Sequence, residues 1–140
     1  YRSAAKALGL SDCAFWILYF LRESGEGPDC GLTQSGICSA IYAPKQTVNS
    51  SLKKLEEDGV IELAERTDRR SKAVCLTEKG MVLARQTVDR VLEAEQRAYG
   101  KMTADEQTLF LELFRKYTNL LKTEIKGIRK QDQAVERITK

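Results

Sequence analysis

Between Lys45 and Lys54 the sequence gathers side chains that can read the edges of bases and side chains that can hold phosphates. Amides pair with adenine, lysines pair with guanine or phosphate, and hydroxyls can do either. This stretch holds three lysines and no acid, and the acids begin only at Glu56. A base-reading helix enters the major groove with its N-terminal part, so this order of charges suits DNA binding. For this segment alone, the alternative interpretation is an ordinary solvated helix face.

Apolar residues at helical spacing indicate which way these side chains point. Val48, Leu52 and Leu55 mark the buried side of a helix over 44–58. Successive residues are rotated by about 100°, so Gln46, Ser50 and Lys53 lie opposite the buried side, with three further polar residues flanking them. The DNA-contacting set that we predict for this helix is Lys45, Gln46, Thr47, Asn49, Ser50, Lys53 and Lys54.

A second basic cluster follows, between two short runs that are rich in strand-forming residues. The runs cover 60–65 and 72–76, and the polar segment between them is typical of a hairpin tip. An arginine on a narrow loop can enter the minor groove, where the negative potential is focused. A basic solubilising turn is the alternative, but two basic clusters in one structural unit favour DNA binding. The charged residues of this cluster are Arg66, Asp68, Arg69, Arg70 and Lys72, and Asp68 is placed to pair with one of the arginines.

Glycine, proline and capping residues predict the helices that position these clusters. Ser11 can cap a helix over 11–24, and Thr33 can open a short helix that carries two isoleucines at i,i+4. Pro44 suits the first residue of the next helix, which we expect to end at Gly59. Two short helices followed by a hairpin are typical of a winged helix-turn-helix.

Two longer helices follow the hairpin. Thr77 can cap one over about 78–99, and Thr103 with Glu106 forms a capping box for another that runs to about 126 or beyond. The last helix carries a wide apolar stripe between Phe110 and Ile128, more than one small domain can cover. We therefore expect a mainly α protein with a small β-hairpin, a winged helix-turn-helix with long N- and C-terminal dimerisation helices.

Composition excludes several other classes. The chain has no His, and its four cysteines, Cys13, Cys30, Cys38 and Cys75, have no Cys-x-x-Cys spacing, so we expect no metal and no cofactor. The longest strongly apolar run, Cys13 to Leu21, is far too short to span a bilayer. We expect a cytoplasmic protein with reduced thiols and no membrane partner. The net charge of +3 is small, so the local clusters carry the case for DNA.

Five segments of the sequence resemble the MarR family of bacterial regulators over about residues 10–130. They are Leu32-Thr33-Gln34-Ser35, Gln46-Thr47-Val48-Asn49 through Leu55-Glu56, Gly59-Val60-Ile61, Asp68-Arg69-Arg70 and Leu76-Thr77-Glu78-Lys79-Gly80. The resemblance implies a homodimer joined through its terminal helices that binds pseudo-palindromic, double-stranded promoter DNA, usually as a repressor. Thr33, Gln34 and Ser35, from the first segment, complete the expected DNA-binding set. Many members carry a serine N-cap where Pro44 stands and a basic residue where Ser50 stands, so the operator sequence is not transferable.

The resemblance also implies a division of the chain. Residues 1–10 and 100–140 are expected to form dimerisation helices. Residues 11–99 are expected to form the winged helix-turn-helix with its linking long helix. Ligands of such proteins often sit between these parts.

The positions of the cysteines bear on how the protein would sense an effector. Redox-sensing members use a cysteine in their first helix, but residues 1–10 contain none and Cys13 begins the second helix. A small-molecule sensor, or no sensor, is therefore favoured over an oxidation switch, and mild peroxide is expected to leave operator affinity within a few fold. Phe15, Trp16 and Tyr19 are candidates for a pocket that takes a small aromatic or anionic effector. Packing in the core or in the dimer is the favoured alternative for these rings.

Three function classes remain. The first is a sequence-specific DNA-binding regulator, and the second is a winged-helix module for protein–protein contact without DNA binding. Arg69 and Arg70 argue against the second class. The third is an enzyme with a cysteine nucleophile, but the sequence offers no His base, no glycine-rich phosphate loop and no paired carboxylates. We therefore expect a regulator and not an enzyme.

Overall fold

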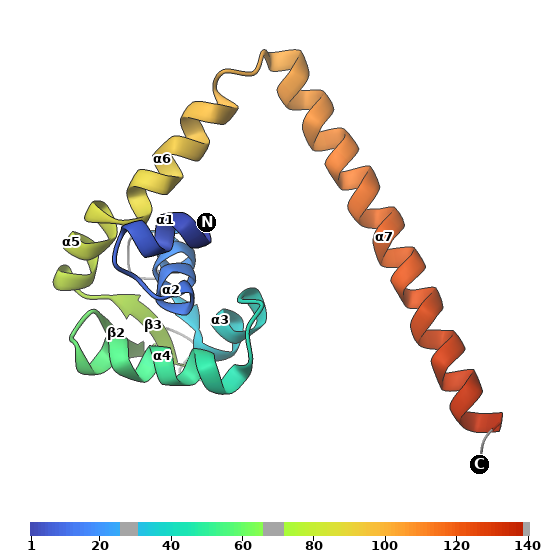
Figure 1. The fold of residues 1–140 in the computed structure, drawn as a ribbon, viewed down its shortest axis with the longest axis horizontal. Coiled ribbons are helices and arrows are strands. Elements are labelled where there is room, and N and C mark those ends of the chain that lie inside the picture. The colour runs from blue at the N-terminus through green and yellow to red at the C-terminus, as the bar shows by residue number, and fades with distance from the viewer. Residues whose placement is uncertain (26–30, 66–71, 139–140) are drawn as a thin grey trace. The chain divides into compact units, whose positions relative to one another are not determined.

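The computed structural model describes residues 1–25, 31–65 and 72–138, with side chains described up to residue 127. The elements are α1 (Arg2–Ala7), α2 (Asp12–Glu23), β1 (Leu32–Thr33), α3 (Gln34–Ala40), α4 (Lys45–Glu57), β2 (Ile61–Glu65), β3 (Lys72–Leu76), α5 (Glu78–Gln86), α6 (Val88–Tyr99) and α7 (Ala104–Ile138) (Figure 1). They fall into two compact units, Tyr1–Glu95 and Gln96–Lys140. The expected fold class, a mainly α winged helix-turn-helix, is confirmed.

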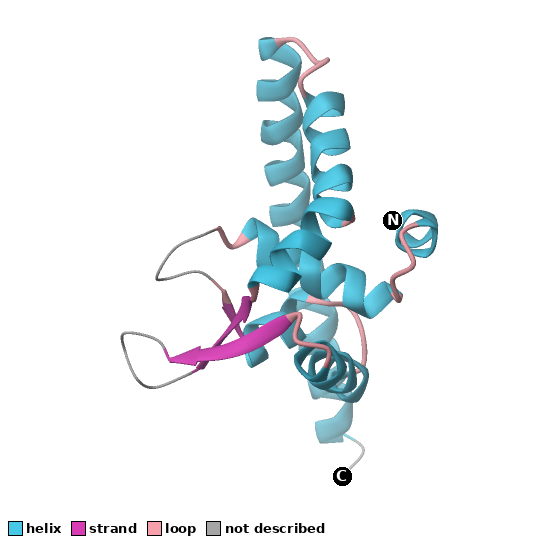
Figure 2. Ribbon diagram, turned by 90° about the vertical axis from the view of Figure 1, so that its left-hand side faces the viewer, coloured by secondary structure: helices cyan, strands magenta, loops and turns pink. Residues whose placement is uncertain are grey.

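The strands form a small antiparallel sheet in the order β1-β3-β2 (Figure 2). The expected hairpin is present, with Ile61 opposite Leu76 and Leu63 opposite Val74. Val74 of the central strand also faces Leu32 of β1. Strand β1 was not predicted, because two residues are too few to show an alternating pattern.

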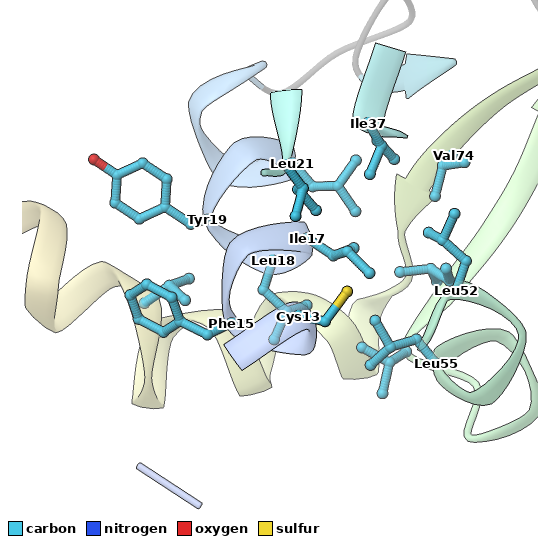
Figure 3. Packing of buried hydrophobic residues seen from close by; sticks show 14 of the residues in the cluster. Cys13, Phe15, Ile17, Leu18, Tyr19, Leu21, Ile37, Leu52, Leu55 and Val74 are labelled. Atoms are coloured by element: carbon cyan, nitrogen blue, oxygen red, sulfur yellow. The ribbon is translucent and has the colours of Figure 1, made fainter. Parts of the chain in front are cut away.

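The core of the first unit is built around α2. Phe15, Ile17 and Leu18 are fully buried, and Figure 3 shows them packed against side chains that come from other elements. Ile37 of α3 and Val74 of β3 are also fully buried in this cluster. Burying an aliphatic or aromatic side chain of this size contributes about 1.5–3 kcal/mol. The core therefore holds the helix-turn-helix and the sheet together.

Most helix starts lie where their capping residues predict them. The hydroxyls of Ser11, Thr33 and Thr77 each accept a hydrogen bond from the amide three residues later. Pro44 is a small correction, because it stands at the N-cap of α4 and Lys45 is the first helical residue. Pro44 has no side-chain hydrogen-bonding group, so the first amides of α4 receive no side-chain cap.

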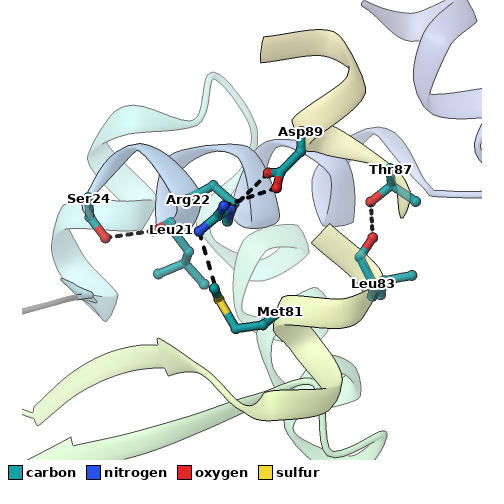
Figure 4. A network of polar contacts seen from close by, with 7 residues as sticks. All are labelled: Leu21, Arg22, Ser24, Met81, Leu83, Thr87 and Asp89. Carbon is teal, nitrogen blue, oxygen red and sulfur yellow. Dashed lines mark hydrogen bonds and ion pairs between the residues drawn. The ribbon is translucent and has the colours of Figure 1, made fainter. Parts of the chain in front are cut away.

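The expected single helix over 78–99 is wrong, because the chain breaks it at Thr87 into α5 and α6. Thr87 is buried and leaves the helical region, with φ −123° and ψ −89°. Its hydroxyl donates to the carbonyl oxygen of Leu83 at 2.6 Å, a back-bond from i to i−4 that often bends helices (Figure 4). Threonine inside an otherwise helical pattern was too weak a signal to predict the break.

The segment Leu76-Thr77-Glu78-Lys79-Gly80 joins the start of α5 to the end of α4. The Thr77 hydroxyl donates to the carbonyl oxygen of Gly59 at 2.6 Å, and the Lys79 ammonium donates to that of Asp58 at 2.6 Å. A Cβ on Gly80 would lie 2.0 Å from the carbonyl oxygen of Val60, so only glycine fits this approach. This clamp sets the position of the hairpin relative to α4.

In the second unit, the capping box that opens α7 is confirmed. The amide of Thr103 donates to Glu106 Oε2 at 2.7 Å, and the amide of Glu106 donates to Thr103 Oγ1 at 3.3 Å. Along α7 the large apolar side chains are exposed, with exposed fractions from 42% at Leu121 to 61% at Tyr117. The described residues of the second unit, therefore, do not cover this stripe.

A partly buried ion pair ties α2 to the first turn of α6. Arg22 Nε lies 2.8 Å from Asp89 Oδ1, and Arg22 Nη2 lies 3.0 Å from Asp89 Oδ2, a two-pronged contact (Figure 4). Arg22 Nη1 also contacts Met81 Sδ of α5 at 3.9 Å. The side chains of Arg22 and Asp89 are only 20% and 17% exposed, so solvent screens this pair weakly.

We predict that Asp89→Ala lowers the free energy of unfolding by about 2 kcal/mol, because it removes the two hydrogen bonds that the Asp89 carboxylate accepts from Arg22 in a partly buried site. Urea unfolding followed by circular dichroism measures this change. The control is Arg90→Ala on the exposed side of the same helix, for which we expect a change within about 0.5 kcal/mol. Equal effects from both variants would show that the ion pair does not hold α6.

Candidate nucleic-acid interface

Helix α4 presents one polar face to solvent. The side chains of Val48, Leu52 and Leu55 are at most 7% exposed, so the opposite side of the helix faces solvent. The predicted residues that are exposed on this helix are Lys45, Gln46, Thr47, Ser50, Lys53 and Lys54. The arrangement of buried and exposed positions agrees with the wheel drawn from the sequence.

Two local contacts shape the groups on this face. The hydroxyl of Ser50 donates to the carbonyl oxygen of Gln46 at 2.9 Å, which leaves its lone pairs as acceptors. Lys53 Nζ lies 3.7 Å from Glu57 Oε1, and both side chains are mostly exposed, 78% and 64%. Such a pair is weak, so Lys53 can leave Glu57 for a stronger anion. The exposed face of α4 therefore carries cations and hydrogen-bonding groups that can exchange partners.

The N-terminus of α3 lies next to α4 and supplies two further exposed candidates. Gln34 and Ser35 are exposed. The hydroxyl of Thr33 accepts from the Gly36 amide at 3.0 Å and lies 3.1 Å from the Ser35 hydroxyl. Thr33 thus opens α3, while Gln34 and Ser35 are the members of this group that face solvent.

Asn49 differs from the rest of the α4 set because it is half-buried at the junction with α3. Its Oδ1 accepts from Gln34 Nε2 at 3.1 Å and from Cys38 Sγ at 3.6 Å. Cys38 was not predicted as part of this site. The available signal was its i,i+4 spacing from Gln34, which puts both residues on one side of α3.

The structure describes one residue of the predicted hairpin cluster. Lys72 begins β3, is exposed and stands opposite Glu65 in the sheet. Arg66, Asp68, Arg69 and Arg70 lie outside the described residues.

A cavity of about 720 Å³ lies beside the start of α4. Trp16 and Phe20 of α2 line it together with the turn that joins α3 to α4, and Thr47 reaches it from α4. Cys13, also in its wall, donates from Sγ to the carbonyl oxygen of Thr47 at 3.9 Å. At its rim Arg2 Nε lies 2.8 Å from Asp12 Oδ2. The cavity is thus lined mainly by apolar residues, and its one cation, Arg2, is paired with the Asp12 carboxylate.

Of the three predicted effector-pocket rings, only Trp16 lines this cavity. Phe15 is fully buried in the core. Tyr19 is 9% exposed, and its hydroxyl donates to Glu95 Oε2 at 2.7 Å. Burial raises the pKa of Tyr19, and the hydrogen bond to Glu95 raises it further. Tyr1 also donates to Glu95, and this bond is the main cause that raises the pKa of Tyr1. Tyr19 therefore serves the packing of α2 against α6.

Other kinds of site find no support in the described part of the chain. Residues 1–25, 31–65 and 72–127 contain no group of three or more His, Cys, Asp or Glu side chains that could hold a metal ion. Among the described helices, none is both long and apolar enough to cross a membrane.

Comparison with known proteins agrees with the fold. The sequence model of the MarR family matches residues 8–71. The chain is 28% identical over 109 residues to the uncharacterized HTH-type transcriptional regulator YwoH of Bacillus subtilis strain 168, covering 78% of this chain and 76% of YwoH. The family model spans α2 through β2, which include the helix-turn-helix.

Two solved structures are similar in fold. The DNA complex of MepR from S. aureus superimposes with a TM-score of 0.64 at 21% identity, covering 86% of this chain and 84% of MepR. The Mycobacterium tuberculosis MarR family protein Rv2887, in complex with salicylic acid, superimposes with a TM-score of 0.55 at 27% identity, covering 83% of each chain.

The expectation of a transcription regulator agrees with these matches. Structure and comparisons indicate the same fold. The structure has a helix-turn-helix with a polar α4 face and a three-stranded sheet, and the chain is similar in sequence and fold to proteins of this type. The chain is thus similar in sequence over residues 8–71, and in fold over most of its described length, to winged helix-turn-helix transcription regulators of the MarR family.

Proposed function

We propose that this regulator works as a homodimer that binds pseudo-palindromic promoter DNA through α4 and represses transcription. The observation that carries the proposal is the polar face of α4, basic from Lys45 to Lys54, opposite the buried Val48, Leu52 and Leu55. Two such helices related by a two-fold axis would enter successive major grooves, with half-sites about 10 bp apart.

The distribution of charge along α4 suits DNA binding from the first turn of the helix. Lys45 stands at the N-terminal end, where the uncapped amides of the helix also favour negative charge. Acidic residues occur only in the last turn, at Glu56 and Glu57, away from the entering end. MepR, whose fold this chain shares, has been solved with DNA bound, which supports the same use of the fold here.

The apolar stripe of α7 supports the homodimer. Phe110, Leu113, Phe114, Tyr117 and Leu121 are each between 42% and 61% exposed in the single chain. Exposed apolar surface of this extent on one helix normally marks a protein–protein interface. A second copy of this chain is the occupant that also supplies the two-fold axis required by a palindromic site. We propose that residues 100–140 and residues 1–10 form the dimerisation segments.

The cavity beside α4 supports a small-molecule effector. Trp16 and Phe20 offer faces for an aromatic ring, and Arg2 offers a cation for a carboxylate. Salicylic acid, bound in the complex of Rv2887, is a ligand of this class. Because the cavity wall includes Pro44 and Thr47, a ligand there would press on the start of α4 and change its approach to DNA.

We predict that Leu113→Asp combined with Leu121→Asp dissociates the dimer, because two buried carboxylates would lack partners in the interface. Sedimentation velocity at micromolar concentration measures the mass, and circular dichroism checks that the first unit stays folded. Glu112→Gln, an exposed position on the same helix, is the control and should remain dimeric. A wild-type protein that sediments as a folded monomer would overturn the dimer proposal.

We predict different effects at the two parts of the DNA site. Lys53→Ala should change which sequences are selected from a random DNA pool, because Lys53 faces base edges. Arg70→Ala, by contrast, should weaken binding to all sequences together and lower the salt slope by roughly one unit for each phosphate that the variant no longer neutralises.

Affinity at several salt concentrations, with Lys101→Ala as a charge-matched control in the second unit, separates these effects. Unchanged affinity and unchanged sequence preference in both variants would rule out the proposed DNA site.

We predict that salicylate quenches the fluorescence of Trp16 in a saturable way and lowers affinity for the selected DNA. Trp16 is the single tryptophan of the chain, so the signal reports on this cavity. Ala43→Phe, which fills part of the cavity wall, should abolish the quenching, and free tryptophan corrects for absorption by the ligand. Quenching that grows linearly without saturation would leave the cavity without this effector.

A further inference from the structure

The structure assigns Asn49 a fixed orientation in which Gln34 and Cys38 hold its amide oxygen, so that it offers DNA only its amino group and selects guanine rather than adenine. This inference rests on the proposed function, since it requires that α4 binds DNA. It names one determinant of sequence preference and two residues of α3 that set it.

Two donors converge on one oxygen at the junction of α3 and α4. Gln34 Nε2 lies 3.1 Å from Asn49 Oδ1, and Cys38 Sγ lies 3.6 Å from the same atom. Asn49 is half-buried there, so its side chain is confined more than the exposed polar residues of α4. The amino group Nδ2 receives no partner from the described residues and is the end of the amide that remains for DNA.

Cys38 decides between the two possible orientations of the amide pair. Gln34 and Asn49 could both turn over and keep one hydrogen bond between them, because each amide has a donor end and an acceptor end. The Cys38 thiol breaks this symmetry, since an S–H group is a better donor to an amide oxygen than an acceptor from an amino group. With Cys38 in place, Oδ1 of Asn49 points into α3 and Nδ2 points away from it.

Because Asn49 Oδ1 is already hydrogen-bonded to Gln34 and Cys38, Asn49 cannot form the usual two-bond pairing of asparagine with adenine. That pairing uses both ends of the amide, Nδ2 to adenine N7 and Oδ1 from adenine N6. An amino group alone matches guanine, which presents two acceptors, N7 and O6, in the major groove. Against adenine the amino group could keep only the bond to N7, and the adenine N6 amino group would find no acceptor. Against cytosine it would meet the N4 amino group, another donor. Gln46 has no such restraint among the described residues and keeps the adenine pairing that we expected of amides on α4.

Lys53 extends the same pattern by one helical turn. Asn49 and Lys53 are i,i+4 neighbours and both line a small cavity of about 90 Å³ next to Gln34. An ammonium group is also donor-only, so this side of α4 offers donors at two successive positions. The expected target is a pair of bases with acceptors at their major-groove edges, with guanine preferred at the Asn49 position.

The test selects DNA from a random double-stranded pool with the wild-type dimer and with variants. Comparison with Asn49→Ala identifies the base pair that Asn49 contacts, because the selected DNA should lose its base preference at that position. At that position the wild type should prefer guanine over adenine by about fivefold or more. Cys38→Ala removes the second donor to Asn49 Oδ1 and should weaken the guanine preference.

Gln34→Glu is the sharper variant because it should reverse the preference. A carboxylate can only accept, so the amino group of Asn49 would turn toward it and Oδ1 would turn toward DNA. The preferred base at that position should then carry a donor, cytosine or adenine. Ser39→Glu, on an exposed position of α3, carries the same added charge and should weaken binding without changing the preferred base. Urea unfolding of each variant checks that the fold is retained.

The outcomes separate the two proposals. If the wild type enriches no sequence at all, the proposed DNA-binding function fails. If it enriches a sequence but prefers adenine at the Asn49-dependent position, or if folded Gln34→Glu weakens binding without changing that preference, the assigned orientation is wrong. If folded Asn49→Ala changes no position, Asn49 does not read bases and the inference is equally wrong.

Discussion

Burial of α2 is the constraint on which the first unit depends. Phe15, Ile17 and Leu18 lie on a helix that is covered on several sides, by α4, by α5 and by β3. Each of these side chains contributes about 1.5–3 kcal/mol when it leaves water. If α2 moved, the surfaces that hold α4 and the sheet would move with it, because all of them pack against the same cluster.

The polar contacts decide how the surrounding elements are aligned on that core. Thr77 and Lys79 bind the carbonyl oxygens at the end of α4, and Arg22 binds Asp89 at the start of α6. Hydrogen bonds have directions and narrow distances, whereas apolar burial depends mainly on area. The core therefore supplies most of the stability, and these bonds fix the angles at which α4, the hairpin and α6 leave it.

The second unit follows a different physical logic. On α7 the apolar stripe faces solvent in the single chain, and the capping box of Thr103 and Glu106 organises only its first turn. In the proposed dimer, a second copy of the chain would cover these apolar side chains. Stability and assembly of this regulator are thus linked in the proposed dimer, since the same residues would contribute to both.

The sequence by itself determined the local features of this protein. The hydroxyl caps at Ser11, Thr33 and Thr77, the hairpin runs and the buried side of α4 all depend on residues close together in the chain, so period and capping rules predict them. The polar face of α4 was predictable for the same reason.

Only the tertiary structure decided the break at Thr87, the position of Trp16 on a cavity apart from Phe15 and Tyr19, and the contacts of Asn49 with Gln34 and Cys38. These features depend on where residues of different elements meet. A helical wheel gives the direction of a side chain, but it cannot tell whether a neighbouring helix supplies a donor to one end of its amide. That decision belongs to packing, because the distance between α3 and α4 is set by the core beneath them.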